Sequence, residues 1–199
     1  MMKKLLVKGN SKMGRLVYLF NLPAQSTCTP THWCLHGRNG KPACYALRGN
    51  HTWARVKQSQ ADRLQASRGA DFVPRVVDEL HAAGCRWFRL HSSGDFYSAD
   101  YVAKWRAIAA VCPDVILRTS TRRRDLAGPI RELAALPNVV IRESLDDDRP
   151  EPVMGLPYAT IDTIPAADRP GVLRCSDHCP SCQYGCWRDG ACHVAFEVH

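Results

Sequence analysis

Ten cysteines stand out in this chain of 199 residues, and eight of them lie in two short polar segments. The first segment, Thr27–Ala46, places Cys28, Cys34 and Cys44 among Thr, Pro, His, Gly and Asn residues that show no helical or strand periodicity. Such a segment buries little apolar surface, so ligation of a metal by thiolates would hold it in place. We therefore predict that these three cysteines are metal ligands.

The second segment spaces Cys175, Cys179, Cys182 and Cys186 by three, two and three intervening residues. Zinc sites usually pair two Cys-x2-Cys units across a longer connection, whereas closely spaced cysteines are typical of ferredoxin-type sites. The spacing favours an iron–sulfur cluster over zinc or unligated thiols. Cys192 follows as a further donor. Including it, the two segments hold enough thiols for two four-thiolate cubanes.

Composition restricts the class of protein. A hydrophobic content of 45% supports one sizeable core, so we predict an α/β domain at residues 1–170 and a cysteine-rich segment at 171–199 packed on it. Apolar runs are shorter than the roughly 18 to 20 residues of a membrane helix, so no membrane partner is expected. In a reducing cytoplasm, the predicted location, cysteines indicate metal sites rather than disulfides. Cys85 and Cys112 lie in apolar segments and are expected to be buried and unligated.

Strands and helices are predicted to alternate between the two cysteine segments. The expected strands are Arg15–Leu22, Cys85–Leu90, Val115–Thr119 and Val139–Arg142, with weaker candidates at Tyr158–Ile161 and Val172–Leu173. The expected helices are Leu47–Ser67, Asp71–Ala83, Ser98–Val111 and Gly128–Leu136. This alternation indicates βαβ units in an α/β fold, either a partial (βα) barrel or a curved parallel sheet.

Catalytic and ligand-binding residues in such folds usually lie at the carboxyl ends of the parallel strands. The Cys28 segment follows the first predicted strand, HSSGDF (His91–Phe96) the second and STRRR (Ser120–Arg124) the third. We expect these loops to meet, and the scaffold to bring both cysteine segments to one place. Arg122–Arg124 and Asp146–Asp148 are interpreted as solvent-exposed charge runs, with phosphate or carboxylate binding as the alternative for the arginines.

The net charge of +8 favours anionic partners, which could be an anionic substrate or a nucleic acid. A metal-stabilised nucleic-acid-binding module is therefore one alternative function. A non-catalytic electron-transfer or redox protein is another, and it would be favoured if every cluster were fully ligated by thiolates.

Three motifs carry a resemblance to a known family: NSKMG from Asn10, CYA ending at Ala46, and HSSGDFYSADYVAKW from His91. Together they resemble the bacteriophage family named for gene product 88, over most of the chain. More remotely, three cysteines after the first strand and a glycine–acid loop after the second are similar to the radical S-adenosylmethionine superfamily. The phage resemblance implies that the predicted location is the host cytoplasm.

The radical S-adenosylmethionine resemblance implies a partial barrel in which Cys28, Cys34 and Cys44 hold a reactive 4Fe-4S cluster. Three thiolates leave one iron open, where the amino acid moiety of S-adenosylmethionine would bind. The resemblance further implies an enzyme that acts on an unidentified substrate and needs a reductant for its cluster.

The same resemblance assigns the loop after the second strand to cofactor binding. Gly94 would allow close backbone approach to S-adenosylmethionine. Asp95 would accept a hydrogen bond from its ammonium group, and Ser93 completes the predicted cofactor-binding set.

Overall fold

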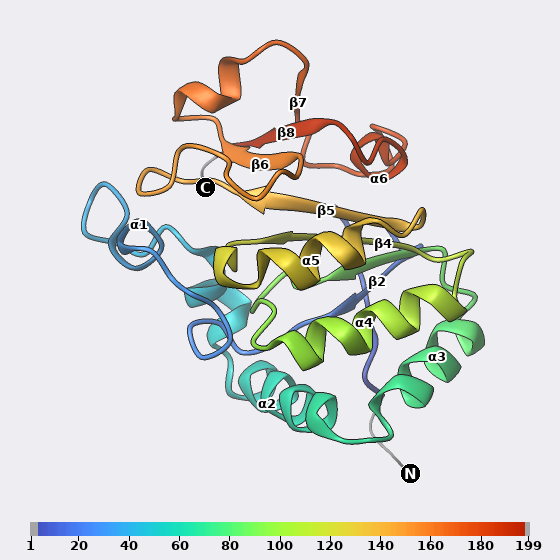
Figure 1. Ribbon diagram of the computed structural model, residues 1–199. Coiled ribbons are helices and arrows are strands. Elements are labelled where there is room, and N and C mark those ends of the chain that lie inside the picture. The colour runs from blue at the N-terminus through green and yellow to red at the C-terminus, as the bar shows by residue number, and fades with distance from the viewer. Residues whose placement is uncertain (1–3, 198–199) are drawn as a thin grey trace.

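The computed structural model describes residues 4–197, and in this part of the chain eight strands form one open sheet (Figure 1). Their order is β1-β2-β3-β4-β5-β6-β8-β7, and all pairs except β1–β2 are parallel. The strands are β1 (Val7–Lys8), β2 (Val17–Phe20), β3 (Trp87–Leu90), β4 (Ile116–Thr121), β5 (Val139–Ser144), β6 (Tyr158–Ile161), β7 (Val172–Arg174) and β8 (His193–Phe196).

Helices connect the parallel strands. The α-helices of the described residues are α1 (His32–His36), α2 (Ala54–Arg68), α3 (Phe72–Ala82), α4 (Ala99–Val111), α5 (Ala127–Ala134) and α6 (Gly185–Arg188). Short 3-10 helices lie in the connections at η1 (Tyr45–Leu47), η2 (Gly49–Thr52), η3 (Arg124–Leu126) and η4 (Pro165–Asp168). No helix within residues 4–197 is long and apolar enough to cross a lipid bilayer.

The main core lies between α3–α5 and one face of the central strands (Figure 1). Phe72, Val76 and Leu80 recur every fourth residue along α3 and are buried, so one side of this helix is apolar. Trp105 of α4 packs edge-on against Phe20 of β2, with 5.4 Å between ring centroids. This packing holds the parallel strands in register, so their carboxyl ends meet at one edge.

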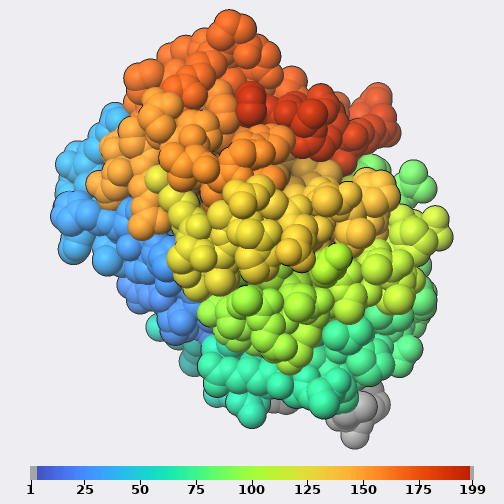
Figure 2. All heavy atoms as spheres, viewed as in Figure 1, coloured from blue at the N-terminus to red at the C-terminus, as the bar shows by residue number. Residues whose placement is uncertain are grey.

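Within the C-terminal segment, β6, β7 and β8 extend the sheet, whereas residues 175–192 pack on its opposite face. Figure 2 shows the C-terminal segment in orange and red beside the yellow segment that precedes it. Trp87 of β3 stacks on Tyr184 at 5.0 Å between ring centroids and meets Trp187 edge-on at 5.9 Å. Residues 175–192 connect β7 to β8, so the second cysteine segment is a crossover between two strands of the sheet.

The predicted fold class is confirmed as mixed α/β with a mostly parallel sheet. All the predicted strands form, including the two weaker candidates. The sheet is open, with β1 and β7 at its edges, and barrel closure is not observed in the described residues. Residues 171–197 contribute β7 and β8 to the sheet itself, while residues 1–3 and 198–199 of the predicted ranges lie outside the described part of the chain.

The helix predicted over Leu47–Ser67 is shorter than expected. Two 3-10 turns precede it, and α2 begins only at Ala54. Gly49 takes φ of +58°, a left-handed conformation that interrupts helical geometry. The prediction also missed α1, α6 and β8, which are five residues long or shorter and lie within or directly beside the cysteine segments. Elements this short give little periodicity.

Buried His91, directly after β3, should make the fold sensitive to acid. Burial lowers its pKa to about 3 from an ordinary value of 6.5, while its Nε2 atom lies 2.9 Å from the Tyr101 hydroxyl. As the pH falls, His91 is protonated in the unfolded chain before it is protonated in the folded protein. The stability that is present above pH 6.5 is therefore lost as the pH falls towards 3. The loss should reach about 4 kcal/mol.

Urea unfolding between about pH 4 and pH 7 measures this dependence. His91→Gln should flatten it, whereas His32→Gln, at an exposed position of α1, should leave it unchanged. The same pH slope in His91→Gln and the wild type would contradict the role of His91.

Candidate metal centre

The first cysteine group lies where the parallel strands end. Cys28 follows β2, Cys34 lies in α1 and Cys44 directly precedes η1. Thr31 caps α1, its hydroxyl oxygen accepting a hydrogen bond from the Cys34 amide at 3.2 Å. The Cys44 amide donates to the Cys34 carbonyl, also at 3.2 Å. These backbone contacts bring Cys34 and Cys44 together in a segment predicted to lack regular structure.

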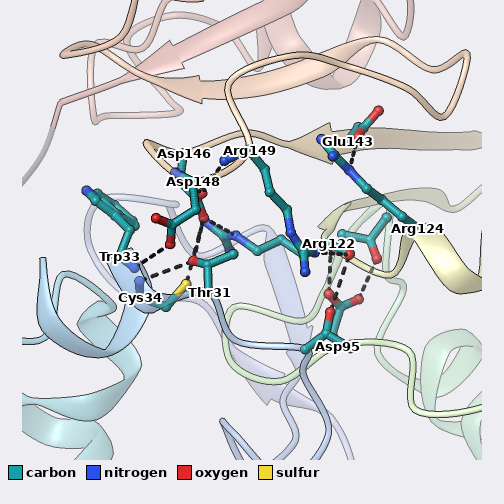
Figure 3. Close-up of polar contacts among 12 residues, drawn as sticks. Thr31, Trp33, Cys34, Asp95, Arg122, Arg124, Glu143, Asp146, Asp148 and Arg149 are labelled. Carbon is teal, nitrogen blue, oxygen red and sulfur yellow. Dashed lines mark hydrogen bonds and ion pairs between the residues drawn. The ribbon is translucent and has the colours of Figure 1, made fainter.

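The three thiols lie near Arg122, the residue directly after β4. Arg122 interacts electrostatically with Cys28, Cys34 and Cys44. The Sγ atom of Cys34 also lies 4.0 Å from Oδ2 of Asp146 (Figure 3). The loops after β2 and β4 therefore meet at this edge, as the sequence predicts.

Burial keeps thiols of this group protonated in the metal-free chain. Burial, together with the smaller effect of the Asp95 carboxylate, raises the pKa of Cys28 to about 12. Burial also raises the pKa of Cys44. A thiol must lose its proton to bind metal, so ligation here would release protons and become more favourable as pH rises.

Asp146 connects α1 to the loop after β4 (Figure 3). Its Oδ2 atom accepts hydrogen bonds from the Thr31 hydroxyl and from Nε of Arg122, each at 2.9 Å. Its Oδ1 atom accepts from two backbone amides of the following turn. The predicted solvent-exposed run Asp146–Asp148 is therefore wrong for Asp146, whose side chain is fully buried because protein donors replace water.

The predicted exposed run of Arg122, Arg123 and Arg124 is also wrong. Each guanidinium is paired with a carboxylate at 2.9 Å or less, and the side chains are only 12–28% exposed. The partners of Arg122 and Arg124, Asp146 and Glu143, are completely buried. These ion pairs turn the arginine side chains inward, and Figure 3 shows Arg122 reaching towards Asp146 and Cys34 and Arg124 paired with Glu143.

Ser93 and Asp95 hold the loop after β3 to its neighbours. The Ser93 hydroxyl donates to the Leu22 carbonyl at 2.9 Å. Asp95 accepts from the Thr121 hydroxyl at 2.7 Å and from the Arg122 amide at 2.9 Å, one bond to each carboxylate oxygen. The loop thus stabilises the edge of the sheet through contacts within the protein. The predicted binding of S-adenosylmethionine by these residues stays a prediction.

The second cysteine group lies in the β7–β8 crossover. The Cys175 amide donates to the Ala195 carbonyl and the Cys179 amide to the Lys12 carbonyl, each at 2.8 Å. Cys186, in α6, interacts electrostatically with both of these cysteines. Burial raises the pKa of Cys175 and of Cys179. Three of the predicted ligands therefore interact with one another, and burial favours the protonated thiols of Cys175 and Cys179 in the absence of metal.

The other two thiols of this group differ in their surroundings. Cys182 is exposed, and its Sγ atom donates to the Cys179 carbonyl at 3.4 Å. Cys192 accepts a hydrogen bond at its Sγ atom from Nη2 of Arg142, 3.0 Å away. Cys182 is thus free to turn, whereas Cys192 is held against the sheet.

Buried arginines face the second cysteine group. Arg118 of β4 and Arg142 of β5 are 3% and 0% exposed, and Arg89 of β3 is the partner of Arg118 in the sheet register. Among the described residues, Nε and Nη2 of Arg118 and Nη1 of Arg142 are buried without a hydrogen-bond partner. Such atoms are rare because burying a charged donor without an acceptor is costly.

The charge state of Arg118 reflects these neighbours. Burial, the largest cause, lowers the pKa of Arg118, and the like charges of Arg89 and Arg142 lower it further. Cys186 and Cys179 act in the opposite direction. Ionised thiolates would therefore stabilise the guanidinium, and the guanidinium would stabilise them.

The two cysteine groups occupy different places. Figure 1 shows α1 and α6 at opposite ends of the sheet, so the prediction that the fold brings both groups together is wrong. Within residues 4–197, no three His, Cys, Asp or Glu side chains converge as a preformed metal site. Ligation by either group would need side-chain rearrangement. Cys85 and Cys112 are buried in the main core, as predicted.

Comparison with known proteins places the chain in one family. A family model described as Gene product 88 matches residues 3–192, which include both cysteine groups. The chain belongs to the gene product 88 family. Neither the curated proteins nor the solved structures include a significant match. The predicted phage-family resemblance is confirmed, whereas a relation to the radical S-adenosylmethionine superfamily is not shown.

In this gene product 88 protein, sequence reasoning missed the arginines beneath the second cysteine group. Arg89, Arg118 and Arg142 occupy strands buried on both faces. Central parallel strands are usually continuous apolar runs. An arginine inside each of these strands was therefore the sequence signal that could have indicated a buried charge. Their common side of the sheet could not be read without the strand register.

Gly94 approaches protein atoms closely, and its substitution should destabilise the gene product 88 fold. Its φ is +82°, and an added Cβ would lie 2.6 Å from Cβ of Leu22 and 2.7 Å from Oγ1 of Thr27. Gly171 has φ of +80° but nothing within 4 Å of the added carbon. Gly171→Ala therefore measures the cost of the backbone conformation alone.

Urea unfolding should show a loss of about 3 kcal/mol for Gly94→Ala and about 1 kcal/mol for Gly171→Ala. Equal losses would mean that the space beside Gly94 is not tightly packed.

Proposed function

We propose that this is an iron–sulfur protein in which Cys175, Cys179, Cys182 and Cys186 hold a 4Fe-4S cluster. The observation that carries the proposal is the buried Arg118 guanidinium, which has two nitrogens without a hydrogen-bond partner and interacts electrostatically with Cys175, Cys179 and Cys186. Four thiolates make a ligated cluster an anion overall. Such a group would supply the negative charge that neutral thiols cannot.

The donor set and its surroundings also suit a cluster. Soft thiolates at short intervals are the usual ligands of iron–sulfur clusters. The stacked rings of Trp87 and Tyr184, with Trp187 edge-on to both, form an apolar wall beside Cys179 and Cys186. Such a wall limits the access of water and helps to set the reduction potential. A cluster bound here would supply one-electron transfer.

We further propose that Cys28, Cys34 and Cys44 form a second site of three thiolates. Three ligands leave one iron of a 4Fe-4S cluster open to S-adenosylmethionine, the arrangement of a radical-S-adenosylmethionine-like enzyme. The cationic Arg122, which interacts electrostatically with all three thiols, supports an anionic group here, as Arg118 does at the second cysteine group. Because both oxygens of Asp95 are engaged by the protein, the number of thiols is the main support for this role.

A nucleic-acid-binding module is the second candidate function, favoured by an exposed aromatic and basic surface. Trp53 is 46% exposed and Tyr45 48% exposed. The Arg55 guanidinium lies 4.9 Å from the Trp53 ring centroid. Bases of a single strand stack on such rings. Salt-dependent oligonucleotide binding by a colourless, iron-free protein would favour this function.

Substitution of a cysteine in the second cysteine group should lower the iron content. After anaerobic reconstitution in host-like reducing conditions, Cys179→Ala and Cys182→Ala should each lower the iron and sulfide content at least about twofold, because the cluster loses a ligand. Cys112→Ala, in the main core, should keep its iron and lose only about 1 kcal/mol of stability. Unchanged iron in both ligand variants would refute the terminal site.

Arg118→Met should have opposite effects on the metal-free protein and on the protein that carries the cluster. Without metal, the substitution removes a buried charge and should raise the free energy of unfolding by about 1–3 kcal/mol. With the cluster present, it removes a compensating cation and should lower iron retention during dialysis. Arg106→Met, at an exposed position on α4, should change neither quantity. If the metal-free Arg118→Met protein were less stable than the wild type, the buried charge of Arg118 would not be a cost to the metal-free fold, and this support for a cluster would be lost.

A further inference from the structure

A small cavity lies at the carboxyl edge of the sheet. It has a volume of about 350 Å³. Its walls are formed by Thr29, Arg122, Arg124, Asp125 and Arg149. Ligands of open parallel sheets bind at this edge, outside the carboxyl ends of the strands.

Two of the cavity arginines are held from behind by buried carboxylates. Nε of Arg122 donates to Asp146 at 2.9 Å, and Nε of Arg124 donates to Glu143 at 2.7 Å. Within residues 4–197, no protein acceptor forms a hydrogen bond with either Nη atom of Arg122 or with Nη1 of Arg124. The carboxylates thus orient the guanidinium groups and leave their outer nitrogens for a ligand.

Arg149 adds a cationic side chain that forms no ion pair within residues 4–197. Its Nη1 atom donates to the Arg122 carbonyl at 3.2 Å (Figure 3), and no carboxylate of the described chain lies within ion-pair distance of it. Asp125, the acid in the cavity wall, is already bound by both Nε and Nη2 of Arg123, at 2.9 and 2.7 Å. The cavity is therefore positively charged.

We propose that this cavity binds the phosphate group of a small phosphorylated ligand. Guanidinium groups bind phosphate through paired N–H donors, and the wall also includes Thr29, whose hydroxyl donates to the Arg122 carbonyl at 3.3 Å. The volume is near the lower limit of small-molecule pockets, about 300 Å³, which suits a ligand of mononucleotide size rather than a polymer. This site goes beyond the iron–sulfur proposal and needs no metal, because its arginines are positioned by protein carboxylates.

Isothermal titration calorimetry on the metal-free full-length protein tests the proposal with two probes, pyrophosphate and adenosine 5′-monophosphate. Both should bind saturably. Arg149→Ala should weaken both about tenfold by removing a charged donor, and Arg149→Lys should restore part of the loss by keeping the charge. Arg106→Ala, an exposed arginine on α4, is the matched control and should bind like the wild type.

Thr29→Val is a second test that keeps all the charges, and it should weaken both probes less than Arg149→Ala does. Equal affinity in Arg149→Ala and the wild type, or no saturable heat with either probe, would overturn the proposal. Binding of a single-stranded oligonucleotide without binding of the mononucleotide would also overturn it, in favour of nucleic acid. Loss of iron binding with phosphate binding intact would refute only the cluster proposal.

Discussion

Both faces of a parallel sheet must be covered, and the two covers of this sheet are chemically different. Helices α3–α5 cover one face with apolar side chains. The other face carries the buried charges of Arg118 and Arg142, for which an apolar helix would provide no compensation. The β7–β8 crossover covers it with aromatic rings and thiols. The segment that shields this face of the sheet is therefore also the segment that carries the proposed metal ligands.

Buried carboxylates organise the carboxyl edge of the sheet. Asp95 joins the loop after β3 to the loop after β4, and Asp146 joins the latter to α1. Ion pairs of this kind contribute little net stability, but they select one arrangement because any other would leave a buried charge unpaired. The position of Cys34 next to Arg122 depends on these contacts. The side chains of this edge are thus placed by acids whose carboxylate oxygens are bound by other protein groups.

Much of the fold follows from the sequence because its signals are local. The alternation of apolar strands with the stripe of Phe72, Val76 and Leu80 predicts the parallel sheet and its helical cover. The loops that meet after β2 and β4 follow from that topology. The pairing partner of a charged side chain is not a local property, so the burial of Asp146 could not be predicted. Nor could the position of Arg118 beneath the cysteines, which depends on a crossover whose path leaves no periodic pattern.

The strand order near the end of the sheet has a consequence for how the protein is made. β8 lies between β6 and β7, and β7 pairs with β8 alone among the described strands. During synthesis, β7 leaves the ribosome before the strand it must pair with, so it cannot join the sheet until residues 193–196 have emerged. The crossover of residues 175–192, which covers the buried arginines, is therefore held between two strands of the sheet only after β8 has inserted.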